Sequence, residues 1–287
     1  MYIIRMKISI MGLGFVGGSM YKSFTMKGAK VKGYDKYKEN TDSFEDCLDS
    51  DICFLALPTI FDEEKMSYDY SSIDEVCVQL TEAQYPGIVV IKSTVEPTTI
   101  EKLSNTFALK FVHNPEFLTA ATAFEDFHNQ THIVLGKGKN ADDGDVDCLK
   151  RFYSKHYPDA EISVCTSTES ESMKSFVNCF YAVKIQFFNE LYALCDKMGC
   201  DYNTVKDLML KNKWINPMHT DVPGIDGKIS YGGYCFPKDT NALLQHMKRE
   251  NTPYLLLEAT VKERNMMRND HVNVKQKNNK DFKAGFD

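Results

Sequence analysis

The sequence lacks the features that mark two broad classes of protein. Its 287 residues contain no apolar run of about 18 residues, the length that a membrane-crossing helix needs. The formal net charge of −6 leaves no basic excess to neutralise phosphates. We therefore expect neither a membrane protein nor a nucleic-acid-binding protein.

Signals for metal binding and secretion are also missing. The nine cysteines have no framework spacing, and Cys195 and Cys200 lack histidine or cysteine partners at zinc-ligand spacing, so we expect no metal site. Residues 1–14 have no small-residue cleavage site and run directly into a strand and a glycine pattern, unlike a signal peptide. Together with the odd cysteine count, this predicts reduced thiols and a cytoplasmic location.

Short apolar runs alternate with amphipathic segments through the first half of the chain. Several runs lack polar alternation, as expected for parallel strands buried on both faces, and the segments between them are long enough for crossover helices. This pattern predicts an α/β fold with a doubly wound, Rossmann-type parallel sheet. The predicted strands are Lys7–Met11, Lys30–Tyr34, Ile52–Leu57, Ile88–Lys92, Leu109–Val112, His132–Leu135 and Ile162–Cys165.

From Thr168 the pattern is helical. Thr168–Glu171 has the form of a capping box, and the helix can run to Met198, with Gly199 as its stop. A second long helix is expected over Tyr254–Asn269. An apolar stripe on the first helix is interpreted as core: Met173, Val177, Phe180, Phe187, Leu191, Leu194 and Met198.

These patterns divide the chain into two domains and a tail. The Rossmann-type domain is expected over residues 1–167 and a helical domain over residues 168–270. Residues 271–287 are polar and aperiodic, and are expected to form a frayed tail.

The motif GLGFVG at Gly12–Gly17 directly follows the first predicted strand, and a helical pattern follows it. Asp35 ends the next strand, where its carboxylate could accept from both ribose hydroxyls of adenosine and would repel a 2′-phosphate. The combination predicts an NAD site, although Lys36 and Lys38 leave NADP possible. The alternative is a glycine turn that only packs a helix on a sheet. The predicted cofactor contacts here are Gly12, Gly14, Phe15, Val16, Gly17 and Asp35.

A second motif, YGGYCFPKD at Tyr231–Asp239, places a thiol before a helical pattern. Pro237 suits the first position of a helix, so Cys235 would lie at a helix N-terminus beside Lys238, and both features stabilise a thiolate. Gly232 and Gly233 would leave room for a substrate. The alternative is a buried cysteine beside a capping Asp239. With an NAD site, a nucleophilic thiol indicates alcohol oxidation that continues through a thiohemiacetal and a thioester to a carboxylate.

Five ordered motifs support a resemblance that extends over about Lys7 to Asn269. In addition to the two motifs above, these are KSTVEP (Lys92–Pro97), NPEFL (Asn114–Leu118) and the helix Glu171–Glu190. The sequence resembles the UDP-glucose 6-dehydrogenase family of nucleotide-sugar dehydrogenases, whose members carry the helical, 6-phosphogluconate-dehydrogenase-like dimerisation domain expected here.

The resemblance implies a role for each matching residue. Cys235 is the implied nucleophile, and Lys174 and Asn178 are implied to hold the reacting oxygen from one helical face. Glu116, Asp239 and Thr94 are implied to position or activate the hydrolytic water. Thr59, Thr94 and Lys238 are the further implied cofactor contacts, and the implied substrate contacts are Phe117, Leu118, Lys174, Asn178, Tyr231 and Gly232.

The sequence also departs from the family pattern. Thr119–Ala121 follow NPEFL in place of a glutamate and a glycine, and Trp214 stands near the usual position of an arginine. Typical members continue with a further α/β domain that grips the nucleotide, whereas this sequence ends at Asp287.

The resemblance favours a homodimeric enzyme that oxidises a nucleotide sugar, UDP-glucose above all, with two NAD per turnover. Successive Leu255, Leu256 and Leu257 suit burial from several sides, as in a dimer core. Two alternatives stay open: a β-hydroxyacid-type dehydrogenase that needs no cysteine, and an NAD-binding or oligomerisation module without turnover.

Overall fold

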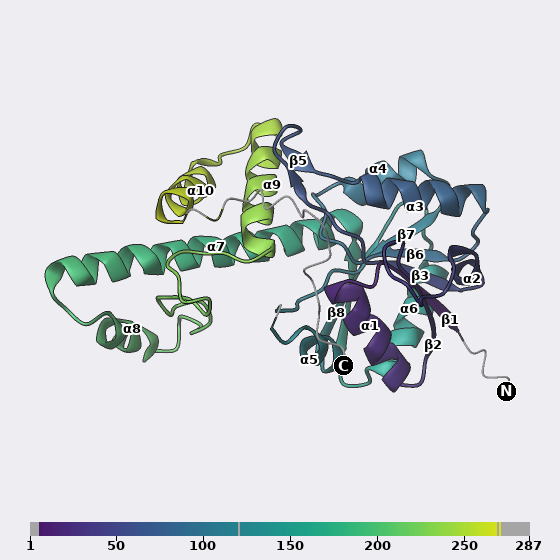
Figure 1. Ribbon diagram of the computed structural model, residues 1–287, viewed down its shortest axis with the longest axis horizontal. Coiled ribbons are helices and arrows are strands. Elements are labelled where there is room, and N and C mark those ends of the chain that lie inside the picture. Colours follow the sequence, from purple (N-terminus) through teal and green to yellow (C-terminus); the bar gives the residue numbers. More distant parts are fainter. Residues whose placement is uncertain (1–5, 120, 269, 271–287) are drawn as a thin grey trace. The chain divides into compact units, whose positions relative to one another are not determined.

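The computed structural model describes residues 6–119, 121–268 and 270, which form two compact units (Figure 1). Unit 1 contains the chain up to Ile60 and Asp69–Lys174, and unit 2 contains Phe61–Tyr68 and the chain from Ser175 onward. The predicted tail over residues 271–287 lies outside the described residues. In the described part of the chain, no helix is long and apolar enough to cross a membrane.

Unit 1 is built on a seven-stranded sheet in the order β2-β1-β3-β6-β7-β8-β9. The chain passes from β1 to neighbours on both of its sides, β2 and β3, which is the switch point of a doubly wound fold. All seven predicted strands are confirmed, with ends that shift by up to two residues. They are β1 (Lys7–Met11), β2 (Lys30–Tyr34), β3 (Ile52–Leu55), β6 (Ile88–Ile91), β7 (Lys110–His113), β8 (His132–Lys137) and β9 (Glu161–Thr166).

The sheet is not parallel throughout. The first five strands of the order pair in parallel, but β8 runs antiparallel to β7, and β9 follows β8 in parallel. The apolar pattern of a strand reports its burial and not its direction, so the sequence could not show this reversal. The carboxyl ends of β1, β3, β6 and β7 still meet at one edge, where ligands bind in such sheets.

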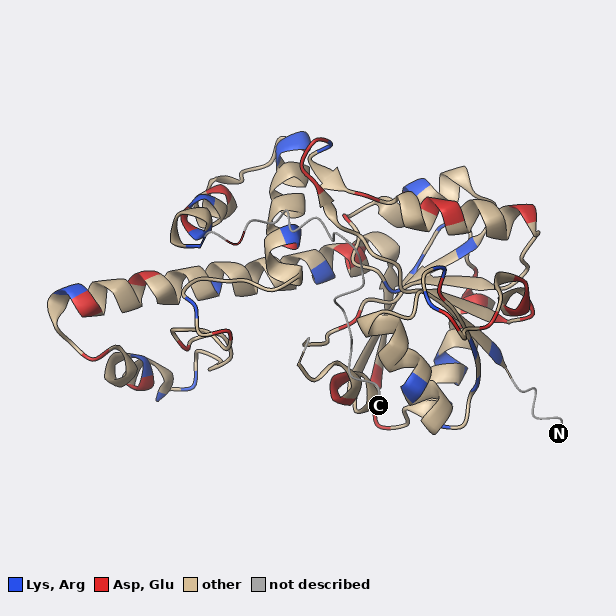
Figure 2. Cartoon of the chain, in the orientation of Figure 1, with Lys and Arg blue, Asp and Glu red and all other residues tan. Residues whose placement is uncertain are grey.

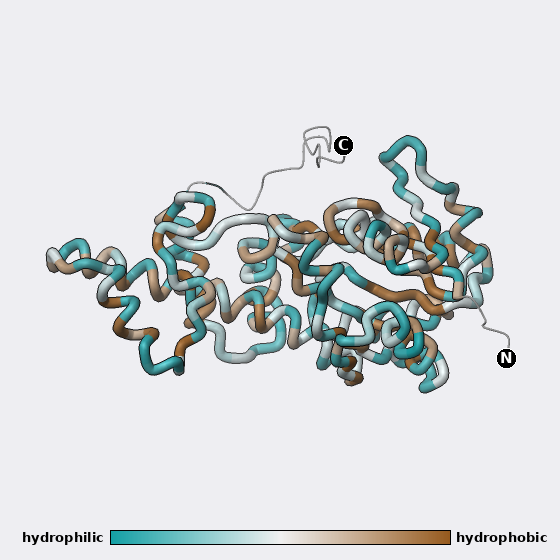
Figure 3. The backbone as a smooth tube through the Cα atoms, turned by 90° about the horizontal axis from the view of Figure 1, so that it is seen from below, coloured by the Kyte–Doolittle hydropathy of each residue, from teal (hydrophilic) through white to brown (hydrophobic). Residues whose placement is uncertain are grey.

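Helices cover both faces of the sheet, as the unbroken apolar strands require. Alternate strand residues face two separate cores, with Ile8 and Ile10 in one and Met11 in the other. Figure 3 shows hydrophobic segments within unit 1, and acidic and basic residues are interspersed in Figure 2. The helices are α1 (Phe15–Met26), α2 (Phe44–Leu48), α3 (Ser71–Glu82), α4 (Thr99–Thr106), α5 (Ala123–His128) and α6 (Asp143–His156).

Unit 2 is helical, with one short hairpin. A small core joins Cys179 of α7 to Leu243 of α9 and Val261 of α10, and a second core surrounds Phe188 and Tyr202. Its elements are the hairpin β4 (Phe61–Asp62) and β5 (Ser67–Tyr68), α8 (Tyr202–Leu210), α9 (Cys235–Arg249), α10 (Leu255–Met267) and most of α7 (Ser167–Met198). Gly199, with φ +72°, follows α7 as predicted.

The predicted capping box at the start of α7 is wrong by two residues. Glu169, and not Glu171, accepts from the backbone N–H and the hydroxyl of Thr166, both at 2.8 Å. Glu171 is fully buried and accepts instead from the N–H groups of Thr98, at 2.8 Å, and Ile100, at 2.7 Å. It therefore caps α4, which lies far away in the sequence, and burial raises its pKa to about 7.

The apolar stripe predicted as the core of α7 is largely exposed in this chain. The buried side of α7 also carries two amides, which bond a residue of a neighbouring loop: Asn189 Oδ1 accepts from Ser230 N at 2.7 Å, and Gln186 Oε1 accepts from Ser230 Oγ at 2.6 Å. Leu255 and Leu256 of α10 are also exposed, whereas Leu257 is buried. The exposed members of the predicted stripe are Phe180, Phe187, Leu194 and Met198.

Candidate active site

The three glycines of the loop after β1 have three different physical roles. Gly12 has φ +88°, and a Cβ there would lie 2.6 Å from the carbonyl oxygen of Ala56. A Cβ on Gly17 would lie 1.8 Å from Gly12 O, so only glycine lets α1 approach the loop this closely. At Gly14 such a Cβ would have no atom within 4 Å other than those of its immediate chain neighbours. The fold does not require Gly14, but a pyrophosphate on the backbone would.

The start of α1 is suited to an anion. Gly14 is the N-cap and offers no side chain to the first-turn N–H groups, and that turn carries no acidic residue. Phe15 and Val16 are the first two residues of the helix, and Phe15 is exposed. A helix start of this kind, with the positive end of its dipole and no acidic side chain, suits a phosphate.

Asp35 lies next to the glycine loop. One carboxylate oxygen accepts from Leu13 N at 2.8 Å and the other from Tyr37 N at 3.0 Å, so the loop and the end of β2 are tied together. The two lysines that left NADP possible have partners in the chain: Lys36 pairs with Glu75 at 2.6 Å, and Lys38 donates to Leu13 O at 2.6 Å.

The loops after β3 and β6 bring Thr59 and Thr94 together. Both threonines are buried, and Thr59 Oγ1 donates to Thr94 O at 2.7 Å. Ser93 strengthens the junction, because its hydroxyl donates to Leu57 O at 2.7 Å. These two predicted cofactor contacts thus lie at the carboxyl edge of the sheet, as does the glycine loop.

Glu116 and Lys174 form a buried ion pair in unit 1. Lys174 Nζ lies 3.1 Å from Glu116 Oε1 and also donates to Glu116 O at 2.6 Å. Lys174, only 4% exposed, therefore does not lie on a solvated face of α7. Lys174 Nζ also lies 5.5 Å from the ring centre of Phe117, and Leu118 N donates to Glu116 Oε2 at 2.6 Å. The NPEFL segment and α7 thus hold four of the predicted residues together.

A second buried lysine, Lys92, contacts the same NPEFL segment, and no role was predicted for it from the sequence. Lys92, only 1% exposed, donates to Asn114 Oδ1 at 3.0 Å and to Pro115 O at 3.3 Å. Burial lowers its pKa to about 7; Glu116 opposes this shift and Lys174 adds to it. In the sequence, Lys92 ends a predicted strand and is the first residue of the KSTVEP motif, but neither feature indicated that its side chain is buried.

In unit 2, Asn178 and Asp239 form a buried hydrogen-bonded pair. Asn178 Nδ2 donates to Asp239 Oδ2 at 2.5 Å, and Lys238 Nζ lies 2.5 Å from the other carboxylate oxygen. Asp239 is 1% exposed. Lys238, predicted as a cofactor contact, is an ion-pair partner of Asp239 within this unit.

Cys235 is the first residue of α9, and its side chain is exposed. The helix starts two residues earlier than Pro237 suggested, so Cys235 and Asp239 lie four residues apart on one face of it. Tyr231 is buried, and a Cβ on Gly232 would lie 2.4 Å from the Arg268 guanidinium. Gly233, with φ +75°, borders open space instead.

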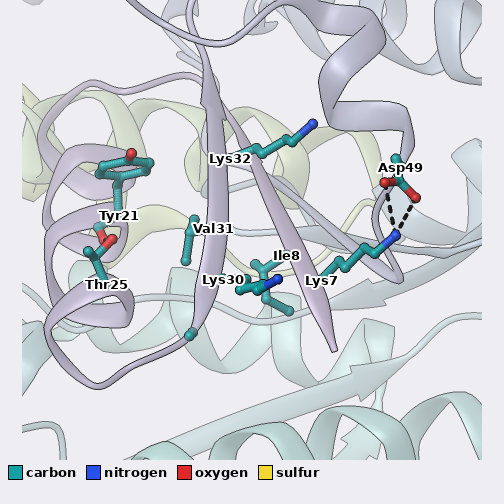
Figure 4. Close-up of a pocket in the computed structure, with 9 residues that line it drawn as sticks. Lys7, Ile8, Tyr21, Thr25, Lys30, Val31, Lys32 and Asp49 are labelled. Carbon is teal, nitrogen blue, oxygen red and sulfur yellow. Dashed lines mark hydrogen bonds and ion pairs between the residues drawn. The ribbon is translucent and has the colours of Figure 1, made fainter. Parts of the chain in front are cut away.

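Unit 1 also contains a groove of about 440 Å³ (Figure 4). It is lined by Lys7 and Lys30, the first residues of β1 and β2, so it lies at the opposite edge of the sheet from the glycine loop. Lys7 is paired with Asp49 at 2.7 Å. Among the described residues there is no cluster of three His, Cys, Asp or Glu side chains that could hold a metal.

Within each unit the predicted residues are therefore brought together in groups. Unit 1 holds the dinucleotide loop, the Thr59–Thr94 contact and the Glu116–Lys174 pair, and unit 2 holds Cys235 and Asp239 on one helix with Asn178 beside them. The fold and the glycine loop define unit 1 as a dinucleotide-binding domain of the dehydrogenase type.

Comparison with known proteins assigns the chain more narrowly. Residues 34–156 match the NAD binding domain of the UDP-glucose/GDP-mannose dehydrogenase family, and residues 168–266 match its central domain. The chain belongs to this family, and unit 1 is an NAD-binding domain.

Individual relatives agree with this assignment. The chain is 31% identical over 207 residues to the UDP-glucose 6-dehydrogenase of Rickettsia bellii (strain RML369-C), covering 70% of this chain but 45% of that enzyme. It thus spans about half the length of this relative. A UDP-glucose dehydrogenase structure from the hyperthermophilic archaeon Pyrobaculum islandicum matches with a TM-score of 0.81 and 25% identity, over 93% of this chain and 70% of that one.

A third likeness is to the fold alone. The Mycobacterium tuberculosis 3-hydroxyisobutyrate dehydrogenase matches with a TM-score of 0.71 over 94% of this chain and 96% of that one, at 16% identity. The architecture by itself therefore does not separate nucleotide-sugar dehydrogenases from dehydrogenases of the β-hydroxyacid type.

Proposed function

We propose that the chain is an NAD-dependent nucleotide-sugar 6-dehydrogenase that oxidises the CH₂OH group of a UDP-sugar, most favourably UDP-glucose, to a carboxylate. The observation that carries the proposal is the placement of Cys235 at the N-terminus of α9, with Asp239 one turn later, in a chain that also has an NAD-binding domain. A simple alcohol dehydrogenase has no use for such a thiol.

The reaction balances as two oxidations and one hydrolysis. NAD, when bound, accepts one hydride in each oxidation. The alcohol first loses a hydride and a proton to give an aldehyde, and the Cys235 thiolate adds to its carbon. The thiohemiacetal anion formed in this way then loses a second hydride and becomes a thioester. Water cleaves the C–S bond, which releases the carboxylate and restores the thiol.

The buried polar groups supply the remaining roles. We propose that Lys174 and Asn178 hold the reacting oxygen, since an ammonium and an amide stabilise developing negative charge on it. Glu116, Asp239 and Thr94 position or activate the water. Phe117, Leu118, Tyr231 and Gly232 border the sugar. A reactive thiol requires a reducing environment, so we place the activity in the cytoplasm.

We further propose that the protein works as a homodimer. Phe180, Phe187 and Leu194 on α7, together with Leu255 and Leu256 on α10, are large apolar side chains that are exposed in the single chain. Exposed apolar groups of this size are typical of protein interfaces.

The test is NADH absorbance with a panel of UDP- and GDP-sugars, for the wild type and Cys235→Ser. Two NADH per sugar, with loss of carboxylate formation in the variant, would support the thioester route and identify the sugar. Turnover of a hydroxyacid that does not depend on Cys235 would favour the β-hydroxyacid alternative, which the fold likeness supports. NAD binding without turnover of any substrate would favour a binding module.

A further inference from the structure

The hairpin β4–β5 is an excursion of the unit 1 sequence that packs in unit 2. Phe61 pairs with Tyr68 across the two short strands, and both side chains are buried, at 7% and 3% exposed. The carboxylate of Asp62 stabilises the turn by accepting from Glu64 N at 2.9 Å and Lys65 N at 3.1 Å. No strand is predicted here from the amino-acid pattern, because each strand has only two residues.

The hairpin lies along α9 and is attached to both ends of this helix (Figure 1). Near the N-terminal end, the hydroxyl of Tyr68 donates to Oδ1 of Asp239. At the C-terminal end, Arg249 donates to Met66 O at 3.0 Å. The docking therefore sets the position of the phenol against Asp239, one turn after Cys235 on α9.

The Asp239 carboxylate receives three hydrogen bonds from three different segments. Oδ1 accepts from Tyr68 and from Lys238, and Oδ2 accepts from Asn178. Rotation of the carboxylate about its Cβ–Cγ bond would break all three. The Lys238 ammonium also lies 4.7 Å from the ring centre of Tyr68, so the Tyr68 side chain contacts both members of the Lys238–Asp239 ion pair.

We propose that Tyr68 is a positioning residue for the reaction: its hydroxyl holds the Asp239 carboxylate in the orientation that hydrolysis of the thioester needs. The proposal rests on the function proposed above. A hydroxyl that donates to a charged, buried acceptor contributes more than an ordinary hydrogen bond, and an acceptor that loses it is free to turn toward its remaining donors. Tyr68 acts through Asp239 and has no contact with the sugar in this scheme.

The test compares wild type, Tyr68→Phe, Asp239→Asn and the double variant in single turnover, with enzyme in excess over UDP-glucose. Free sugar acid is separated from protein-bound sugar after an acid quench, so that even slow hydrolysis is measured, and NADH is followed in parallel. The matched control is Tyr85→Phe, which also removes a buried phenol hydroxyl, one that contacts Ser50 Oγ at 3.0 Å in unit 1.

We expect Tyr68→Phe to slow release of the acid about tenfold, with protein-bound sugar accumulating and the first NADH formed at the wild-type rate. In the Asp239→Asn background the same change should have no further effect, because the two residues act as a unit. Tyr85→Phe should release the acid at the wild-type rate.

Two results would overturn the inference while leaving the proposed function intact. The first is a Tyr68→Phe variant that releases acid at the wild-type rate. The second is a Tyr68→Phe change that slows acid release by the same factor in the wild-type and the Asp239→Asn backgrounds. The second result would indicate a general structural defect. A wild-type protein that forms no NADH with any nucleotide sugar would refute the proposed function, and the inference with it.

Discussion

Replacing Lys92 with methionine removes a charge from the interior of unit 1. The ammonium is 1% exposed, its hydrogen-bond acceptors are Asn114 Oδ1 and Pro115 O, and burial lowers its pKa to about 7 from the ordinary 10.5. Methionine has a similar length and no charge to desolvate, so it deletes the titration with little loss of packing.

The expected consequence is a pH-dependent difference in stability. Below pH 7, Lys92 is protonated in both the folded and the unfolded state, and the desolvation cost is present in full. Between pH 7 and 10.5 the unfolded chain binds the proton and the folded one does not, so the wild type gains stability as the pH rises. One pKa unit corresponds to about 1.4 kcal/mol. With a folded-state pKa of about 7, integration over this range predicts a rise in the free energy of unfolding of the wild type. Relative to Lys92→Met, the rise is about 2 kcal/mol between pH 7 and pH 9.

The measurement is urea unfolding followed by far-UV circular dichroism, because Trp214 is the only tryptophan and lies in unit 2, where its fluorescence would not follow unit 1. Lys139→Met removes an exposed lysine and serves as the control, with a difference from wild type that stays constant with pH. A constant difference for Lys92→Met as well, or one that changes only below pH 6, would refute the reasoning.

Two further predictions concern glycines. Gly14→Ala should leave the thermal unfolding midpoint unchanged but weaken NAD binding at least tenfold in calorimetry. Gly17→Ala should lower the midpoint by several degrees, because its Cβ would lie 1.8 Å from Gly12 O. Equal effects of the two variants on stability would contradict the assigned roles. Gly232→Ala should destabilise the wild type by about 1–3 kcal/mol but cost clearly less in an Arg268→Ala background, where the guanidinium 2.4 Å from the new methyl is absent. An undiminished cost in that background would show that the backbone, and not Arg268, requires the glycine.

Local patterns in the sequence were sufficient where one segment determines its own structure. The seven sheet strands, the helix stop at Gly199 and the dinucleotide loop were all predicted, since apolar runs, left-handed glycines and the loop motif act over a few residues. The position of the capping box was predicted wrongly because Thr166 and Thr168 are equally good local candidates. The structure uses Thr166 with Glu169, since the Glu171 carboxylate accepts from the first N–H groups of α4.

The prediction that the apolar stripe of α7 forms core was largely wrong for a related reason. Periodicity identifies an apolar face of a helix but not what covers it, and in the single chain Phe180 and Phe187 are exposed, whereas the amides of Gln186 and Asn189 are buried against a loop. The short hairpin that carries Tyr68 was not detected, since two-residue strands have no periodicity to read.

By itself, the sequence determined the α/β class, the NAD loop with Asp35 and the thiol at the start of a helix, because each is encoded within a few consecutive residues. Only the tertiary structure decided the reversal of β8, the burial of Lys92 against the Glu116 segment and the three donors on Asp239. Apart from Lys238, which is the sequence neighbour of Asp239, these features join residues that are from about twenty to more than a hundred positions apart. Such pairings arise from packing and from the need to satisfy buried polar groups, and no local pattern records them.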